Sequence, residues 1–593
     1  MKNASSSLFT KSIQESRQLM DVALGREAAD LAVVNARLLN VYTGEVLEDY
    51  AVCTKGRWIA YVGASPDGAI AETTQIIDAQ GCPLIPGLID GHTHIAWMYT
   101  AAEFLKHVIP GGTTTIITEA METFPIAGYD GVLDFLNSCK DQPVKIFATV
   151  PAMISISKKT RGISTDAVCQ LLKRDDILGL GESYWQAVLQ DPDAILPIFR
   201  QAQLFGKTLE GHSAGATANK LAAYVAAGIS SCHEPITAEE VLDRLRLGLT
   251  VMIREGSIRR DLQAISRIKE SGISFRRLSL VTDGIEPKDL LEKGYMEYVV
   301  QKAIDCGFEP VAAIRMATLN IAEHFSIDNF VGGIAPGRFA DMLILPDLKI
   351  IKPRYVISNG RLVARDGRLL VSPRIHQFTE KSRKSVALPR ELKPSDFSVS
   401  AKTGNPKAVI RMIELITDLV TRETKETLTA AADEIQADLD RDILKVAAID
   451  RTHFPGKMFT GFIKGFNLKA GAIASSGAWD TSDIVVVGTN SADMATAANR
   501  ILALQGGAVV CSRGDILAEI ALPIMGIISE LPMKDLAAKL DSLNTAISQL
   551  GVSLKNPLLT LITLTGAAIP YLRICEEGLV NLKDGRTLGL FID

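Results

Sequence analysis

Short apolar runs alternate with amphipathic, helix-like segments through the middle of the chain. Eight of these runs have the length and composition of buried β-strands, and they cover 88–94, 113–118, 144–150, 177–182, 208–212, 229–233, 250–254 and 278–283. Strands that alternate with helices are typical of a parallel sheet covered by those helices. Eight such units predict an α/β fold in which 85–334 form a (β/α)8 TIM barrel, the catalytic domain.

Apolar runs with Gly and Asp turns flank this middle part on both sides. We expect that 29–84 and 335–378 together form one small β-sandwich domain, built from both flanks of an inserted barrel. The periodicity of residues 9–28 predicts an amphipathic helix, so 1–28 form an N-terminal helical segment.

The last part of the chain has a pattern of its own. Residues 379–407 are rich in Lys, Ser and Pro, which predicts a linker. Beyond it we expect a C-terminal α+β domain at 408–593, with a long helical stretch over 408–447 and a strand over 483–488.

Composition narrows the class of protein. Of the 593 residues 47% are hydrophobic and 22% charged, so the chain can bury a substantial core. A net charge of −5 argues against nucleic acid or an anionic membrane as a partner. The eight cysteines are scattered without a CxxC pair, which argues against a zinc finger or a disulfide framework and favours a reducing cytoplasm. The N-terminus lacks the apolar core of a signal peptide, and the longest apolar run, 557–570, is too short to span a bilayer.

The first predicted barrel strand ends in two histidines. The run PGLIDGHTH at 86–94 places His92 and His94 two residues apart. Residues i and i+2 of a strand point to the same face, so both imidazoles can converge on one point. Two neutral imidazoles on one face are a ready pair of metal ligands.

Four further barrel strands end in a possible ligand or acid–base group, namely Glu182, His212, His233 with Glu234, and Asp283. Each alone has a structural explanation, such as an Asp-Gly turn at Asp283, but five such strand ends are improbable by chance. Active sites of these barrels lie at the carboxyl ends of the strands. Four histidines with carboxylates therefore predict one or two divalent ions, with Mn, Fe and Zn all compatible. His107, His324, His376 and His453 are expected to be structural.

These residues resemble the amidohydrolase superfamily and, within it, the bacterial adenine deaminase family. The likeness covers almost the whole chain and includes EGHSAG at 210–215, REGS at 254–257 and LPIMG at 522–526. It implies hydrolytic deamination of adenine to hypoxanthine and ammonia. It also implies a metal-binding set, in which Glu182 bridges where many superfamily members carry a carboxylated lysine: His92, His94, Glu182, His212, His233 and Asp283.

Roles for the residues around the metal follow from general acid–base chemistry. We expect Asp283 to take a proton from the attacking water and to pass it to the leaving group. Glu234 is the candidate for protonating a ring nitrogen, with a supporting, ion-paired role as the alternative. The candidates for substrate binding are Arg254, Glu255, Trp97 and Glu119.

The chain departs from the family's motifs around this set. Residues Ala96, Trp97, Met121, Gly284, Tyr295 and Trp479 stand where the family carries polar or ionisable groups. A pocket without hydrogen-bond partners for a substrate cannot select it strongly. We therefore expect weak adenine deamination and better turnover of a bulkier or less polar heterocycle, with adenine as the leading named substrate.

Two alternative functions stay open. One is a ring-opening hydrolase of cyclic amides, hydantoinase-like or dihydroorotase-like, against which Glu182 argues because such enzymes favour lysine there. The other is a metal-binding homologue with impaired catalysis. In each case the expected partner is a small heterocyclic molecule, and we expect a homo-oligomer, a dimer or larger.

Overall fold

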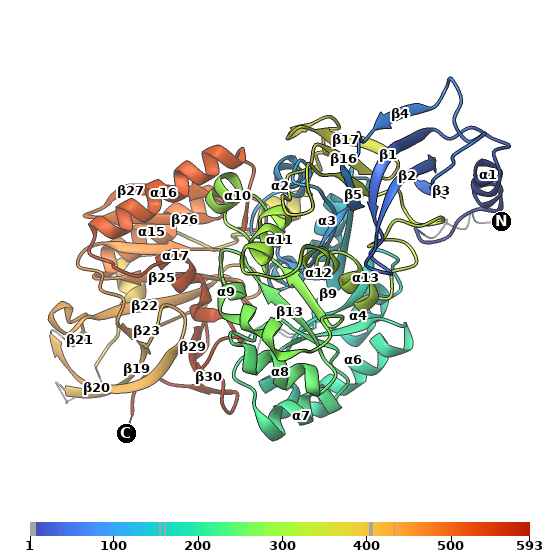
Figure 1. Ribbon diagram of the computed structural model, residues 1–593. Helices are drawn as coiled ribbons and strands as arrows, with labels where there is room; N and C mark the ends of the chain where they lie inside the picture. The colour runs from blue at the N-terminus through green and yellow to red at the C-terminus, as the bar shows by residue number, and fades with distance from the viewer. Residues whose placement is uncertain (1–7, 153–155, 159–161, 402–406, 432, 593) are drawn as a thin grey trace.

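The computed structural model describes residues 8–592, without 153–155, 159–161, 402–406 and 432 (Figure 1). The first helix is α1 (Ile13–Ala23), which begins at a capping box formed by Ser12 and Glu15. It is shorter than the predicted 9–28 because Gly25, at φ 68°, turns the chain out of the helix.

The eight predicted strands form a TIM-barrel-like domain. They are β6 (Leu88–Thr93), β8 (Thr113–Thr118), β9 (Lys145–Val150), β10 (Ile177–Tyr184), β11 (Thr208–His212), β12 (Ser231–Cys232), β13 (Thr250–Arg254) and β14 (Leu278–Val281). Two parallel sheets, β6-β8-β9-β10-β11 and β12-β13-β14, curl toward each other. Hydrogen bonds from Ser230 N to Leu209 O and from Asp283 N to His92 O close the two seams. The carboxyl ends of all eight strands thus meet at one mouth.

Helices follow the barrel strands and bury their apolar faces against them. In α2 (Ala101–Val108), for example, Thr100 caps the first turn, and Phe104, Leu105 and Val108 are buried. The other helices of this part are α3 (Phe124–Cys139), α4 (Thr165–Leu172), α5 (Trp185–Gln190), α6 (Pro192–Leu204), α7 (Ala218–Ala226), α8 (Ala238–Arg246), α9 (Leu262–Ile265), α10 (Pro287–Lys293), α11 (Met296–Asp305), α12 (Pro310–Met316) and α13 (Leu319–His324).

The two flanks of the barrel share one nine-stranded sheet. Its N-terminal strands are β1 (Leu31–Leu39), β2 (Val46–Lys55), β3 (Trp58–Gly63), β4 (Gln75–Asp78) and β5 (Pro83–Pro86). The strands from after the barrel are β15 (Met342–Ile344), β16 (Tyr355–Ser358), β17 (Arg361–Arg365) and β18 (Arg368–Leu369). The flanks meet where β15 pairs antiparallel with β5.

The C-terminal unit contains a second nine-stranded sheet, in the order β21-β20-β19-β23-β22-β25-β24-β26-β27. The strands are β19 (Lys407–Leu415), β20 (Thr421–Ala431), β21 (Glu434–Ile435), β22 (Ile443–Asp450), β23 (Met458–Lys464), β24 (Ala472–Ser475), β25 (Asp483–Gly488), β26 (Gly507–Ser512) and β27 (Asp515–Ala521). A three-stranded sheet, β29 (Leu572–Cys575), β30 (Gly578–Asn581) and β31 (Arg586–Leu588), and the helices α15 (Ser491–Leu504), α16 (Met533–Gln549) and α17 (Pro557–Ile562) complete the unit.

The predicted helix over 408–447 is wrong. The segment forms strands, of which β19 and β20 pair antiparallel along their whole length. Buried Ile410 and Met412 flank the more exposed Arg411, and β20 is rich in threonine. A buried face that repeats every second residue and the β-branched residues of β20 favour a sheet over the predicted helix.

The segment predicted as a linker packs against the C-terminal unit. It contains α14 (Glu380–Arg383), and its apolar residues Val386, Leu392 and Phe397 are buried against that unit's sheet and α15. Residues 379–407 are therefore a segment that packs on the C-terminal unit, in spite of their Lys-, Ser- and Pro-rich composition.

The C-terminal unit, orange and red in Figure 1, docks on the loops at the barrel mouth. The short strand β7 (Met98–Tyr99), which follows β6, pairs with β28 (Ile528–Ser529). Met533 N donates a hydrogen bond to Glu103 Oε1 at 2.8 Å, and Asn556 Nδ2 donates one to Glu286 Oε1 at 2.5 Å. Within the described part of the chain, none of the helices combines the length and the apolar character that a bilayer span needs.

Arg451 ties together three loops of the C-terminal unit, those that contain Ser385, Ser476 and Met525. Arg451 is fully buried and donates hydrogen bonds to the carbonyl oxygens of Ser385, Ser476 and Met525. We expect Arg451→Met to lower the free energy of unfolding of the C-terminal unit by about 2 kcal/mol or more, because buried carbonyls lose their donors. Calorimetric thermal unfolding measures this, with Arg441→Met at an exposed ion pair as the control. Equal melting temperatures for both variants would contradict it.

Candidate functional site

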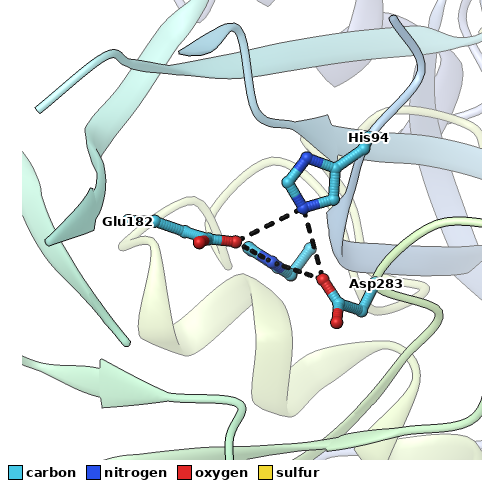
Figure 2. A group of neighbouring side chains, drawn as sticks. His94, Glu182 and Asp283 are labelled. Carbon is cyan, nitrogen blue, oxygen red and sulfur yellow. Dashed lines mark hydrogen bonds and ion pairs between the residues drawn. The ribbon is translucent and has the colours of Figure 1, made fainter. Parts of the chain in front are cut away.

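His94, the residue after β6, points toward the carboxylates of Glu182 and Asp283 at the barrel mouth (Figure 2), and His92 of β6 contacts the same two groups. His92 Nε2 lies 3.1 Å from Glu182 Oε1 and 3.2 Å from Asp283 Oδ1. His94 Nε2 lies 3.3 Å from each of the same two oxygens. Four ligand atoms from three strand ends therefore surround one point.

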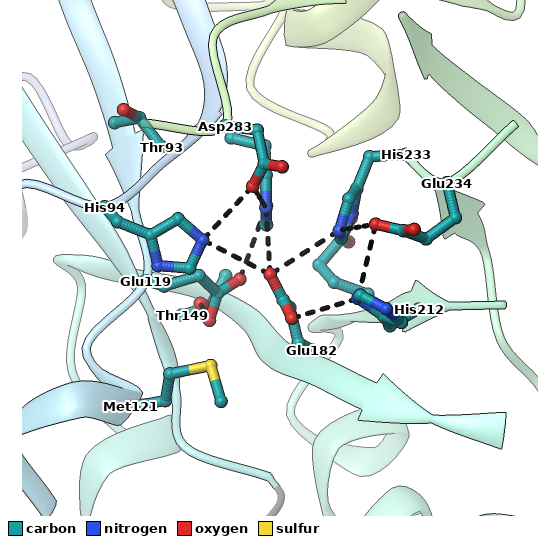
Figure 3. A network of polar contacts seen from close by, with 12 residues as sticks. Thr93, His94, Glu119, Met121, Thr149, Glu182, His212, His233, Glu234 and Asp283 are labelled. Carbon is teal, nitrogen blue, oxygen red and sulfur yellow. Dashed lines mark hydrogen bonds and ion pairs between the residues drawn. The ribbon is translucent and has the colours of Figure 1, made fainter. Parts of the chain in front are cut away.

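The opposite side of Glu182 faces a second pair of histidines (Figure 3). Glu182 Oε2 lies 3.2 Å from His212 Nδ1, and Oε1 lies 3.5 Å from His233 Nε2. Burial opposes the charged form of Glu182, but the four imidazoles hold its pKa well below the usual range. One carboxylate is thus shared by two groups of nitrogen ligands.

Glycines allow these ligands to approach one another. Gly91, Gly181 and Gly211 each directly precede a ligand, and each packs where a Cβ would collide with the neighbouring layer. A Cβ on Gly181, for instance, would lie 2.1 Å from Glu119 Oε2. The sequence needs glycine there because the adjacent side chains fill the space.

The residues present fit divalent metal ions. Both ring nitrogens of His212 are buried; Nδ1 faces only the carboxylates of Glu182 and Glu234, and neither nitrogen forms a hydrogen bond of regular geometry with the described residues. In each of the two groups all ligand atoms lie within 4.8 Å of one another. A tetrahedral ion with bonds of roughly 2.1 Å places its ligand atoms roughly 3.4 Å apart, close to the separations found here.

Two further carboxylates support the histidines from behind. Glu119 Oε1 lies 3.6 Å from His92 Nδ1, and Glu122 contacts His94 Nδ1 directly. Thr149 Oγ1 donates to Glu119 at 2.6 Å. Such carboxylates orient metal-ligating imidazoles and raise their basicity. Glu119, which was predicted to bind substrate, is buried next to His92, and Glu122 takes the equivalent position at His94.

Arg254 joins the two candidate acid–base groups. It contacts Glu234 Oε1 and donates to Asp283 Oδ2 at 3.1 Å, while Asp261 accepts from its other nitrogen at 3.3 Å. Burial favours the neutral form of Glu234, but Arg254 and His212 outweigh it and hold the pKa of Glu234 below its usual range. Asp283 adopts φ 56°, as a turn requires, so this residue both begins the Asp-Gly turn and presents its carboxylate to the histidines.

Glu255 lies apart from this group. Its side chain is buried and forms an ion pair of 2.7 Å with Lys302 on α11. Successive residues of an extended segment point to opposite faces, so Glu255 points away from the face that carries Arg254. This position does not support the predicted substrate contact.

A largely apolar cavity adjoins His94 between the barrel and the C-terminal unit. The barrel contributes Ala96, Trp97 and Ile258 to its wall, and the C-terminal unit contributes Trp479 and Ile562. Three of the positions that depart from the family therefore line it, and Gly284 packs against Trp97.

Tyr295, in contrast, is fully buried against Phe104 and does not line this cavity, because its helix packs on the outside of the barrel. The other four histidines also lie outside the site, as predicted. His107 contacts Glu103, His324 contacts Glu210, His376 contacts Asp134 and His453 contacts Pro125 O.

The C-terminal unit reaches the site through the carboxylate of Asp480. Asp480 Oδ1 accepts a hydrogen bond from Tyr184 at 3.2 Å, and Ala567 N donates to its other oxygen. The Tyr184 ring packs edge-on against His212, with the ring centres 5.2 Å apart. Burial raises the pKa of Asp480 to about 6.

The chain is similar to known proteins along its whole length. The profile of the amidohydrolase family matches residues 84–363, and that of the adenine deaminase C-terminal domain matches 418–586. An adenine deaminase of Moorella thermoacetica is 37% identical over 95% of this chain and 96% of its own. Those of Clostridium botulinum strain 657 and Cenarchaeum symbiosum are each 35% identical, covering 98% and 95% of this chain and 99% and 93% of their own. A crystal structure of a β-aspartyl dipeptidase from Fervidobacterium islandicum matches 57% of this chain and 98% of its own, with a TM-score of 0.46 at 17% identity.

We predict that His92→Ala and His94→Ala each remove at least one equivalent of bound metal. Each change deletes a nitrogen from the group shared with Glu182 and Asp283. Elemental analysis of the purified proteins measures the metal content. His107→Ala, at a histidine on α2 outside the site, is the control, and full metal content in all three variants would contradict the prediction.

Proposed function

The chain belongs to the adenine deaminase family, and we propose that it hydrolyses the C6–amino bond of adenine to give hypoxanthine and ammonia. The protein is a metal-dependent hydrolase that acts on C–N bonds. The observation that carries the proposal is the carboxylate of Glu182 between two pairs of imidazoles, with Asp283 beside one of them.

The ligands divide into two sets that share Glu182. His92, His94, Glu182 and Asp283 would hold one ion, and His212 and His233 with Glu182 would hold a second. Divalent ions in these sets supply Lewis acidity, which activates water for attack on a ring carbon. The set suits Mn, Fe or Zn.

Asp283 is placed to move protons. Its Oδ1 faces His92 and His94, and its Oδ2 is held by Arg254. We assign it the transfer of a proton from the attacking water to the leaving amino nitrogen, which converts a poor leaving group into ammonia. Burial opposes ionisation of Asp283, but the neighbouring histidines and Arg254 hold its pKa well below the usual range, so the carboxylate is ionised and can accept a proton.

Glu234 is the second proposed catalytic carboxylate, opposite a ring nitrogen of the substrate. Arg254 stabilises its charged form, so proton donation by Glu234 requires that the bound substrate weaken this ion pair. Arg254 then remains on Asp283 and keeps that carboxylate aligned. Trp97 is the proposed substrate-side wall, and Glu119 acts by orienting His92.

We also propose the finer organisation of the chain. The small β-sandwich comprises 29–84 and 335–378, the α+β domain comprises 408–593, and the protein acts as a cytoplasmic homo-oligomer on a small heterocycle. Sedimentation of the purified protein tests the oligomeric state.

The activity is tested with the metal-reconstituted protein. We expect equal amounts of hypoxanthine and ammonia from adenine, and no ring opening of hydantoin or dihydroorotate. A metal-replete preparation that opens a cyclic amide but releases no ammonia from adenine would overturn the proposal in favour of a ring-opening hydrolase.

We predict that Asp283→Asn lowers kcat for deamination by at least about 10²-fold while much of the metal is retained, because the amide cannot accept the proton. The deamination rate and the metal content are measured on the same sample. Asp541→Asn, at an exposed ion pair with Lys288, is the control. An unchanged kcat would show that Asp283 only shapes the turn.

A further inference from the structure

We infer that Asp480 of the C-terminal unit is a positioning residue for the metal ligands of the barrel, and that it acts on His212 through Tyr184. The inference rests on the proposed function, because it uses the two ligand sets proposed there. The first set is His92, His94, Glu182 and Asp283, and the second set is His212, His233 and Glu182. The inference adds a role for the C-terminal unit at the second set.

The ring of His212 lacks the polar support that the histidines of the first set have. The outer nitrogens of His92 and His94 each face a carboxylate. The Nδ1 atom of His212 faces Glu182 and Glu234 (Figure 3), but its Nε2 atom is buried and has no hydrogen-bond partner among the described residues. Metal-ligating imidazoles are usually oriented by a hydrogen bond from their second nitrogen. Packing must therefore orient the ring of His212.

Tyr184 supplies this packing. It lies on β10 and is paired in register with His212 on β11. The two rings meet edge to face, with centres 5.2 Å apart and an interplanar angle of 86°. The backbone of His212 is held separately, because its N–H donates to the Tyr224 hydroxyl at 2.9 Å. The contact with Tyr184 therefore limits the rotation of the His212 side chain.

Asp480 in turn fixes Tyr184. The Tyr184 hydroxyl donates a hydrogen bond to Asp480 Oδ1 at 3.2 Å, and both side chains are buried. Ala567 N donates to Asp480 Oδ2 at 2.7 Å, and Trp479 N donates to Ile562 O at 3.0 Å, so the segment around Asp480 is anchored within its own unit. The carboxylate thus binds one donor from the barrel and one from the C-terminal unit.

This connection leads to one ligand set and not to the other. Among the described residues, neither Tyr184 nor Asp480 forms a hydrogen bond or a ring contact with His92, His94 or Asp283. Loss of the contact between Tyr184 and Asp480 should therefore weaken ion binding at the second set and leave the first set unchanged.

Binding of Zn²⁺ to the metal-free, full-length protein tests the inference. Competition with a chromophoric chelator resolves the binding steps, and His94→Ala and His212→Ala assign them to the first and the second set. Tyr184→Phe keeps the ring and removes the hydroxyl. We expect it to weaken the second step at least about tenfold, since loss of a group that orients a ligating histidine costs about 10-fold to 100-fold in affinity.

Asp480→Asn is the second variant. Asparagine tolerates the left-handed backbone of Asp480, at φ 59°, but offers one oxygen where Tyr184 and Ala567 each need an acceptor. We expect a weaker second step here too. In the Tyr184→Phe protein, however, Asp480→Asn should add less than about twofold, because the remaining oxygen then serves Ala567 alone. Independent effects that multiply would contradict an action through Tyr184.

Matched controls separate positioning from a general loss of stability. Asp442, also in the C-terminal unit and also left-handed at φ 52°, accepts from Gly465 N at 2.9 Å and from Asn467 N at 2.8 Å, so Asp442→Asn makes the same chemical change elsewhere. Tyr61→Phe removes a hydroxyl that donates to Ser65 O at 2.8 Å. Both controls should leave both binding steps unchanged. If Asp480→Asn does not fold, Tyr184→Phe against Tyr61→Phe decides the matter.

The outcomes separate this inference from the proposed function. A second step that is weakened in His212→Ala but unchanged in Tyr184→Phe would overturn the inference alone, and so would an equal loss at both steps. Full Zn²⁺ binding by His212→Ala would overturn the second ligand set and the inference with it. Deamination is measured separately as hypoxanthine, so a protein that binds both ions but releases no ammonia from adenine overturns the proposed function and not this inference.

Discussion

The position of one carboxylate, Glu182, sets the arrangement of the whole site. It faces imidazoles from three other strands at 3.1 to 3.5 Å. Four further carboxylates lie around it, those of Asp283, Glu234, Glu119 and Glu122. Among the described residues, the ion-pair partners of these carboxylates are histidines and one arginine, Arg254. Burying this much negative charge is costly unless cations offset it. Divalent ions held by these residues, as proposed, would therefore stabilise the barrel mouth as they bind.

The convergence depends on close packing of the strand ends. Asp90 accepts a hydrogen bond of 2.6 Å from the Thr282 hydroxyl, which ties β6 to β14 directly beside His92 and Asp283. The glycines before His92, Glu182 and His212 remove the side chains that would otherwise separate the layers. A larger residue at any of them would collide with the adjacent layer, with the Ile321 side chain at Gly91, the Glu119 carboxylate at Gly181 and the Ser231 carbonyl at Gly211.

Much of the barrel could be predicted from the sequence, because its strands are short apolar runs that each end in a chemically informative residue. His92, Glu182 and Asp283 are brought together as expected, since parallel strands present their carboxyl ends at one mouth. The errors arose where local pattern is weak. The strands over 408–447 were predicted as helix, and the directions in which Glu255 and Tyr295 point, which the sequence did not indicate, are set by packing against Lys302 and Phe104. Asp480 meets Tyr184 across almost 300 residues of sequence, a contact for which the chain carries no local signal.

The cavity next to His94 exists only because two units of the chain meet there. The barrel supplies the ligands and the proton-transfer groups, whereas Trp479, Leu522 and Ile562 come from the C-terminal unit. Arg451 fixes the loops that carry this second wall, and the pairing of β7 with β28 fixes their distance from the first. The proposed metal-binding residues and the C-terminal wall of the cavity thus lie on separate parts of the chain. A substitution in that wall changes the cavity without altering His92, His94, Glu182 or Asp283, so those residues can stay the same while the residues around them become larger and less polar.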